Sequence, residues 1–279
     1  MRQTMRPVSL SRVVETAYFA ETTRAFSKQE LATFLKSSEK RGKEVADEIV
    51  NIGLLEKNED QYNETKKGSK FLNYVRTNNW SGIHNLMMEY IFYQTFFTLL
   101  QSIEPSTPEE ILTCLQSSPV QFNQASRDVL CDWGERIGSV QRNIFTDQYF
   151  TLIDSDVPFI PTFLEVYQSL NIQTGLSLRQ RYVEIPKVRE YMCQALRISR
   201  EDFDTQFVEL CLKNIGRIEL AGAPVTTHAK KSAKKVKNMQ FLEFSDKITM
   251  KLSSNQFLNG VKIGQKAYYY VAYHGGELQ

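Results

Sequence analysis

A short pattern that occurs three times along the chain most constrains its fold. It consists of Ile-Gly, one variable residue, an aliphatic residue and then Glu or Gln, and it begins at Ile52, Ile137 and Ile215. An amphipathic helical pattern precedes each glycine and an extended pattern follows it, as expected where glycine ends a helix in the left-handed conformation. The glycines are 85 and 78 residues apart. This spacing predicts a tandem repeat of one helix–turn–strand unit, although Ile-Gly is also a common helix end that can recur by chance.

The first copy of the pattern closes the most clearly organised segment of the chain. Apolar residues at helical spacing predict a first helix over residues 8–22. Ser27 and Glu30 have the spacing of a capping box and open a second, short helix. A third helix ends at Gly53, and residues 54–64 are predicted to form a two-stranded hairpin before a fourth helix starts.

Three helices, a glycine and a two-stranded wing make this segment resemble the winged-helix domains of prokaryotic transcription regulators. The residues that carry the resemblance are 26–31 (Phe-Ser-Lys-Gln-Glu-Leu), 52–55 (Ile-Gly-Leu-Leu) and 65–68 (Thr-Lys-Lys-Gly). The resemblance is one of fold. It implies that the third helix enters the major groove of DNA while the wing touches the backbone or the minor groove, with phosphate contacts supplying most of the affinity.

Extended to the whole chain, the repeat predicts a mostly α (α+β) protein of tandem winged-helix domains, two or three in number, with a helical middle and a C-terminal β-rich wing. We expect an N-terminal winged-helix domain over 1–78, an acidic helical middle over 79–157 that is a candidate second one, and a C-terminal winged-helix domain with a basic loop over 158–279. Two modules, or a single module on a helical body, are the alternatives.

Charge is distributed unevenly along the sequence. The net charge of the whole chain is +2, but residues 1–80 carry +3, residues 81–183 carry −6 and residues 184–279 carry +5. A chain that is nearly neutral overall therefore has two basic ends around an acidic middle. The ends suit nucleic acid, and the middle suits a protein partner or a homodimer contact, because like charges repel a phosphate backbone.

In the predicted N-terminal winged-helix domain, basic side chains cluster at two places. The candidate DNA-binding residues are Lys40, Arg41 and Lys43 at the start of the third helix, and Lys66 and Lys67 just after the wing. Four acids, Glu39, Glu44, Asp47 and Glu48, share that helix, and the predicted wing tip is acidic. A solvated helix of alternating charge, or one that docks on a protein, is therefore the alternative.

The strongest charge feature is a lysine-rich stretch near the C-terminus. Residues 228–237 contain five lysines and no acid, and they lie between strands predicted at 217–221 and 239–244: Lys230, Lys231, Lys234, Lys235 and Lys237. A cationic wing of this kind releases counterions from DNA without reading bases, so it predicts steep salt dependence and weak sequence preference. A surface loop, or a contact for an acidic partner domain, is the alternative.

Aromatic residues form two further patterns. Residues 80–103 are predicted to form one buried, aromatic-rich helix that belongs to the core or to a dimer interface, with His84 as a hydrogen-bonded core residue. Polar residues interrupt this stretch, so its apolar runs are too short to span a membrane. Residues 267–273, with four tyrosines, are predicted to form a strand whose rings pack in a sheet rather than stack on bases.

Signals for catalysis are weak throughout the sequence. The three histidines lack metal-ligand spacing, and nucleotide-binding and hydrolase motifs are not found. The four cysteines show no CxxC spacing, which favours reduced core thiols. We therefore expect no enzyme, no catalytic residue, no cofactor and no metal, and the lack of a secretory pattern predicts a cytoplasmic location.

Together these patterns predict a protein that binds double-stranded DNA mainly through phosphate contacts. It would act either as a transcription regulator or as the DNA-gripping subunit of a larger prokaryotic complex, for example in defence or chromosome maintenance. The alternative is a non-catalytic scaffold or adaptor whose winged helices bind protein partners.

Overall fold

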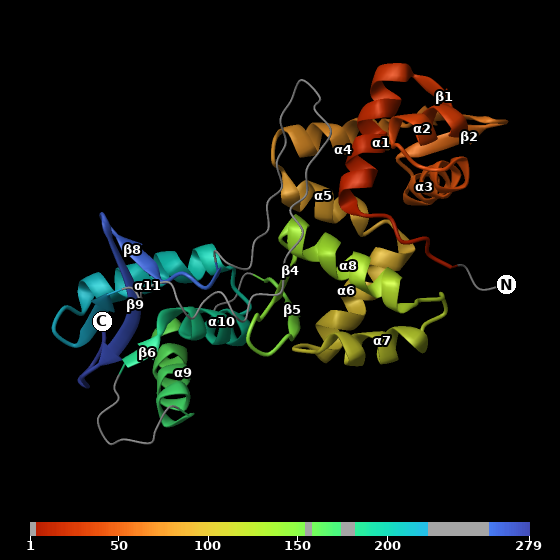
Figure 1. The fold of residues 1–279 in the computed structure, drawn as a ribbon. Coiled ribbons are helices and arrows are strands. Elements are labelled where there is room, and N and C mark those ends of the chain that lie inside the picture. Colours follow the sequence, from red (N-terminus) through yellow and green to blue (C-terminus); the bar gives the residue numbers. More distant parts are fainter. Residues whose placement is uncertain (1–3, 154–157, 174–181, 223–256) are drawn as a thin grey trace. The chain divides into compact units, whose positions relative to one another are not determined.

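The computed structural model describes residues 4–153, 158–173, 182–222 and 257–279. These residues form a mixed α and β structure (α+β) of helices and small sheets (Figure 1). They divide into two compact units, the first ending at Gln141 and the second starting at Arg142.

The first unit opens with a three-helix arrangement joined to a small sheet. Its strands pair antiparallel in the order β1-β3-β2. The predicted capping box is present, because Ser27 accepts from the Glu30 amide while the Glu30 carboxylate accepts from the Ser27 amide. Strand β1 was not predicted from the sequence. The elements are α1 (Leu10–Thr23), β1 (Ala25–Ser27), α2 (Lys28–Phe34), α3 (Glu39–Ile52), β2 (Leu55–Asn58) and β3 (Gln61–Glu64).

Five helices complete the first unit and supply most of its aromatic core. They are α4 (Lys66–Arg76), α5 (Trp80–Met87), α6 (Ile91–Ile103), α7 (Pro108–Gln116) and α8 (Gln124–Ile137). The prediction of one helix over 80–103 was wrong, because the helix is interrupted at residues 88–90, between α5 and α6. Tyr90 there adopts an extended conformation (φ −89°, ψ 116°), and its buried hydroxyl donates to the Glu48 carboxylate of α3. A tertiary hydrogen bond thus outweighs local helix propensity.

A short hairpin, β4 (Val140–Arg142) with β5 (Tyr149–Thr151), follows α8. The sequence after Gly138 predicts a hairpin with strands at 143–145 and 148–152, so the hairpin is present but its first strand lies earlier. Asn143 instead belongs to the turn, where its side-chain oxygen accepts from the amides of Phe145 and Thr146. Such a side-chain-to-backbone bond stabilises a turn at the expense of a strand.

The second unit is built around a sheet in the order β6-β9-β7, with β8 also paired to β9. Its core contains the stacked pair Phe203 and Phe207, with Phe163 beside them. The predicted tyrosine-rich strand is present as β9, which pairs with each of the other three strands. The elements are α9 (Phe159–Gln173), β6 (Tyr182–Glu184), α10 (Ile185–Leu196), α11 (Arg200–Lys213), β7 (Ile218–Gly222), β8 (Val261–Ile263) and β9 (Lys266–Tyr273).

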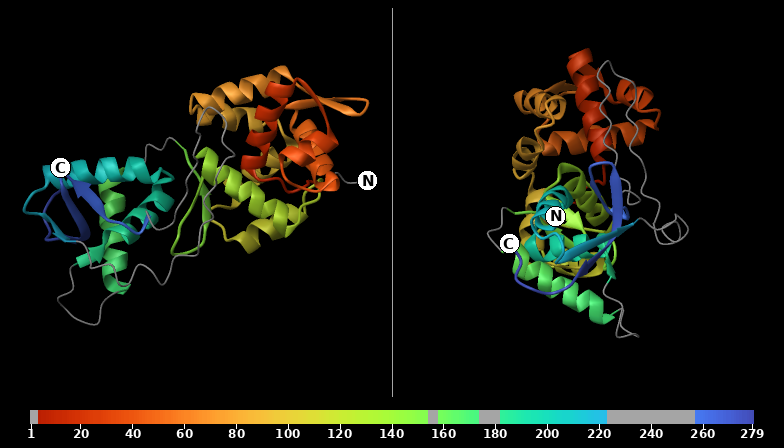
Figure 2. Two further views of the ribbon diagram at one scale, coloured as in Figure 1. Left: turned by 45° about the horizontal axis from the view of Figure 1, so that its top comes forward. Right: turned by 90° about the vertical axis from the view of Figure 1, so that its left-hand side faces the viewer.

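One order of elements occurs in both units. In the first unit α1, β1, α2, α3, β2 and β3 succeed one another, and in the second α9, β6, α10, α11, β7 and β9 do so, with β8 just before the last strand (Figure 2). In both sheets the last of these strands lies between the other two. The three glycines of the recurring pattern all have positive φ, 88° at Gly53, 75° at Gly138 and 90° at Gly216, as predicted. The strand predicted at 239–244 lies outside the described residues.

Candidate nucleic-acid interface

Helix α3 is held tightly against α2, which fixes the direction of its outer face (Figure 1). The Ser38 hydroxyl caps its start by accepting from the Arg41 amide at 3.2 Å, and Gly53 ends it. Gly42 lies on the inner face. A Cβ added there would be 2.8 Å from the Cβ of Ala32 and 2.9 Å from the Lys28 carbonyl oxygen, so only glycine permits this approach.

Three of the four acids on α3 are paired with a cation of the same unit. The pairs are Glu39 with Lys28 at 2.9 Å, Glu44 with Arg41 at 3.1 Å and Asp47 with Arg6 at 3.0 Å. Partly exposed pairs of this kind add little stability, but they cancel the local negative charge. The objection that acids on α3 repel DNA is therefore weaker in the structure than in the sequence.

The fourth acid, Glu48, is completely buried. Its carboxylate accepts from the Tyr90 hydroxyl and, at 3.1 Å, from the Arg6 amide. Burial is the largest influence on this group and raises the pKa of Glu48, which opposes the lowering effect of those hydrogen bonds. Glu48 therefore contributes to the fold and not to the surface of α3.

Lys40 and Lys43 are the exposed cations at the start of α3. Within the described part of the chain, neither has an ion-pair partner within 4.0 Å. Arg41, also predicted to contact DNA, is tied to the protein instead: it donates to the Pro7 carbonyl oxygen at 2.7 Å and to Glu44 at 3.1 Å. The first turn of α3 thus presents two lysines to solvent and uses the arginine internally.

Lys66 and Lys67 lie at the other end of α3. The Lys67 ammonium donates to the Ile52 carbonyl oxygen, the last residue of α3, and pairs with Glu89, both at 2.9 Å. Lys66 is exposed. At a rise of 1.5 Å per residue, roughly 18 Å of helix separates Ile52 from Lys40, so the structure does not gather these four predicted lysines into one cluster.

The hairpin β2–β3 has an acidic tip. Exposed Lys57 is accompanied by exposed Glu56, Glu59 and Asp60. Lys57 lies 5.8 Å from the ring centre of Tyr62, which keeps it close to the strand surface. The start of α3 is therefore better suited to phosphate than the tip of this hairpin is.

The outer faces of α8 and α11 differ from that of α3 in their exposed charged side chains. Glu201 and Asp202 at the start of α11 are exposed, whereas exposed Asp128 of α8 pairs with Arg127 at 2.5 Å and exposed Glu209 of α11 pairs with Lys213 at 2.6 Å. Arg200, at the first position of α11, is bound to the buried Glu190 at 2.5 Å and to the Arg142 carbonyl oxygen. The predicted cationic loop, with Lys230, Lys231, Lys234, Lys235 and Lys237, lies outside the described residues, as do the flanking parts of the loop.

The contacts of residues 4–9, here called the N-terminal segment, were not predicted from the sequence. Arg6 and Pro7 contact α3 as described above, and the Trp133 indole of α8 donates to the Val8 carbonyl oxygen at 3.0 Å. The only local signal was the alternation of Arg6 with the apolar Met5 and Val8, both of which are buried. The N-terminal segment contacts residues that are distant in sequence, so a local pattern could not reveal these contacts.

Comparisons and searches for other kinds of site add the following. No protein-family model, curated protein or solved structure matches the chain. Over the residues that the structure covers, no group of three or more His, Cys, Asp or Glu side chains is placed to hold a metal ion. None of the helices described above is both long and apolar enough to cross a bilayer.

Proposed function

We propose that the chain is a non-catalytic DNA-binding protein built from winged-helix units, in which the start of α3 grips duplex DNA through phosphate contacts. The order of helices and strands supports a winged helix at each end of the described chain, because α1 to β3 and α9 to β9 each have a strand between the first two helices and two antiparallel paired strands after the third. A third winged helix between these two is supported by the series α6, α7, α8, β4 and β5. A helix presented in this way enters the major groove with its N-terminal residues foremost.

One observation carries the proposal: the acids of α3 are paired or buried, whereas Lys40 and Lys43 are exposed at its first turn. Two exposed ammonium groups at the leading end of a helix are suited to neighbouring phosphates. Because lysine is a point charge without planar recognition geometry, such contacts position the protein without reading sequence.

The test is a fluorescence-anisotropy titration of a random-sequence duplex at several salt concentrations. For Lys40→Gln/Lys43→Gln, we expect binding at low salt to weaken roughly tenfold or more and the slope of log K against log[salt] to become shallower by about 1.8. Lys262→Gln/Lys266→Gln removes the same charge from exposed positions on β8 and β9 and serves as the matched control. Equal losses in both variants, or no loss in the first, would contradict the assignment to α3.

A protein-binding adaptor is the second candidate function, and the exposed acids Glu201 and Asp202 at the start of α11 favour it. Under this alternative the purified chain does not retard duplex DNA even at low salt. The same titration therefore separates the two proposals, because DNA binding that vanishes with the α3 lysines excludes a purely protein-binding role.

A further inference from the structure

The N-terminal segment is attached to one side of α3 at two points. The Arg41 guanidinium donates to the Pro7 carbonyl oxygen at 2.7 Å, and the Arg6 amide donates to the Glu48 carboxylate at 3.1 Å. Arg41 and Glu48 are two helical turns apart on the same stripe of α3, so roughly 10 Å of helix separates the two points. Attachment at two such points fixes the tilt of α3 as well as its position.

The other side of the N-terminal segment is fixed to α8 and to the residues before it. The Trp133 indole of α8 donates to the Val8 carbonyl oxygen at 3.0 Å, and the Thr4 hydroxyl donates to the Gln121 side chain at 2.7 Å. Met5 and Val8 are both buried. The segment therefore belongs to the folded first unit and links α3 to α8.

Arg41 is the attachment point at the DNA-binding end of α3. In the sequence it lies between Lys40 and Lys43, the two exposed lysines proposed to contact phosphate. Besides Pro7, its guanidinium donates to Glu44 at 3.1 Å. Arginine suits this place because its planar group presents several donors at fixed angles, so one side chain binds a carbonyl and a carboxylate at the same time.

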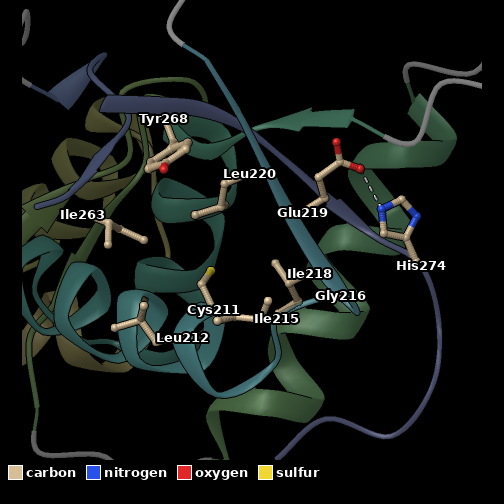
Figure 3. Close-up of a pocket in the computed structure, with 10 residues that line it drawn as sticks. All are labelled: Cys211, Leu212, Ile215, Gly216, Ile218, Glu219, Leu220, Ile263, Tyr268 and His274. Carbon is tan, nitrogen blue, oxygen red and sulfur yellow. Dashed lines mark hydrogen bonds and ion pairs between the residues drawn. The ribbon is translucent and has the colours of Figure 1, made fainter. Parts of the chain in front are cut away.

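In the second unit the corresponding helix, α11, is held in another way. Arg200, its first residue, pairs with Glu190 of the preceding helix α10 at 2.5 Å. Leu212 and Ile215, at and just beyond the other end of α11, border an open pocket of about 520 Å³ (Figure 3). Arg41 differs from Arg200 because it binds a segment outside the helices, so its contact can be altered without changing a neighbouring helix.

We propose that Arg41 is a positioning residue for DNA binding: it holds the first turn of α3 against the N-terminal segment and so places Lys40 and Lys43 for phosphate without touching DNA itself. This role rests on the proposed function of α3. An element that is fixed in its bound position beforehand loses less conformational freedom when the ligand binds, and its affinity is higher for that reason. Release of the N-terminal segment therefore lowers the affinity for DNA while the number of phosphate contacts stays the same.

Two substitutions at Arg41 separate positioning from direct contact in the anisotropy titration of a random duplex. Arg41→Lys keeps the charge but offers one ammonium in place of the planar group, and Arg41→Gln also removes the charge. If Arg41 positions α3, both variants should bind roughly threefold to tenfold more weakly than wild type with an unchanged salt slope. If Arg41 touches phosphate, Arg41→Lys binds nearly as wild type does, and Arg41→Gln has a slope shallower by about 0.9.

Met5→Ala tests the same contact from the side of the N-terminal segment. It shortens a buried, uncharged side chain, so it loosens the segment without changing the charge of α3. We expect weaker DNA binding with an unchanged slope, and an effect that is less than additive with that of Arg41→Lys, because both changes loosen one contact. The matched control is Arg76→Lys, which removes a planar group that donates to Glu21 of α1 at 2.9 Å and 2.5 Å and should leave DNA affinity unchanged.

Hydrogen exchange of the Arg6 amide, measured by nuclear magnetic resonance, gives a readout that does not need DNA. Glu48 holds this amide while the segment is attached, so exchange should be faster in Arg41→Lys and in Met5→Ala than in wild type. Addition of duplex should slow the exchange in wild type, because coupling between two sites is reciprocal.

Circular dichroism checks the folding of each variant, and Met5→Ala carries the test if Arg41→Lys is unfolded. Wild-type DNA binding that Arg41→Lys and Met5→Ala leave unchanged overturns the positioning role alone, as does a shallower slope confined to Arg41→Gln. A wild-type chain that does not bind duplex DNA overturns the proposed function of α3 together with this role.

Discussion

Glu48 lies where the N-terminal segment, α3 and the start of α6 meet. Its carboxylate accepts from the Arg6 amide and the Tyr90 hydroxyl, and its side chain is fully buried. A buried carboxylate is stabilised by such donors but still loses hydration, and here burial has the larger effect and raises its pKa. The residue thus links three segments at a cost that depends on its ionisation.

That cost predicts a pH dependence of stability with a defined sign. Because the pKa of Glu48 in the folded protein is higher than its ordinary value of 4.5, the penalty is absent below pH 4.5 and grows as pH rises through the raised pKa. Each unit of raised pKa corresponds to about 1.4 kcal/mol. Wild-type protein should therefore lose stability with rising pH relative to Glu48→Gln, whose amide mimics the protonated acid.

Urea unfolding at pH values below and above 4.5 measures this effect. Both tryptophans, Trp80 and Trp133, belong to the first unit, so their fluorescence reports the unit that contains Glu48. A difference in unfolding free energy between the two proteins that stays constant across pH would rule out this role for Glu48.

At the scale of elements, close approach between α2 and α3 depends on Gly42. Glycine inside a helix costs about 1 kcal/mol relative to alanine, so its presence needs a compensating reason. The distances of 2.8 Å and 2.9 Å from an added Cβ to Ala32 and to the Lys28 carbonyl supply that reason. The orientation of the outer face of α3 follows from this contact.

Gly42→Ala should therefore destabilise the first unit, although alanine is the better helix former. Overpacking costs about 1–3 kcal/mol, which exceeds or cancels the gain in helix propensity, so we expect a net loss of up to about 2 kcal/mol. Lys43→Ala, at the next and exposed position, is the control and should stay within about 0.5 kcal/mol of wild type. Urea unfolding followed by tryptophan fluorescence gives both values, and an increase in stability for Gly42→Ala would disprove the packing argument.

Elements governed by neighbouring residues could be predicted from sequence, and those governed by distant contacts could not. The capping box of Ser27 and Glu30 depends on residues three apart and is present as predicted. The break before α6 depends on Tyr90 reaching Glu48, which is 42 residues away. Likewise, Lys40 and Lys43 were predicted from the sequence as candidate DNA contacts, which stays a prediction, whereas the pairing of the α3 acids with Arg6 and Lys28 is seen only in the fold.

For the whole molecule, the charge pattern predicts more than one place for the proposed DNA binding. In the first unit the exposed lysines of α3 offer a phosphate contact, whereas the described face of α11 in the second unit is acidic. Basic character in the C-terminal part of the chain therefore rests on the five lysines of 230–237, which remain a sequence-based prediction. The two sets are separated in sequence by about one hundred and ninety residues and can be tested independently.

Replacing those five lysines by glutamine should weaken binding to any duplex and make the salt slope shallower by up to about 4.5. Combined with Lys40→Gln/Lys43→Gln, the changes in slope should add, because the salt slope counts the phosphates that the protein neutralises. Anisotropy titrations of the same random duplex measure all three proteins. Unchanged affinity in the five-lysine variant would remove the loop from the binding surface while leaving the proposal for α3 intact.

The N-terminal segment has a consequence for synthesis of the protein. Val8 is made well before Trp133, which follows 125 residues later, but its carbonyl oxygen accepts from the Trp133 indole. At about 5–20 residues per second, the partner is added roughly 6–25 s after the segment. During that interval α1 to α3 must hold together through their own contacts, and docking of the chain's beginning onto α8 is one of the last steps in completing the first unit.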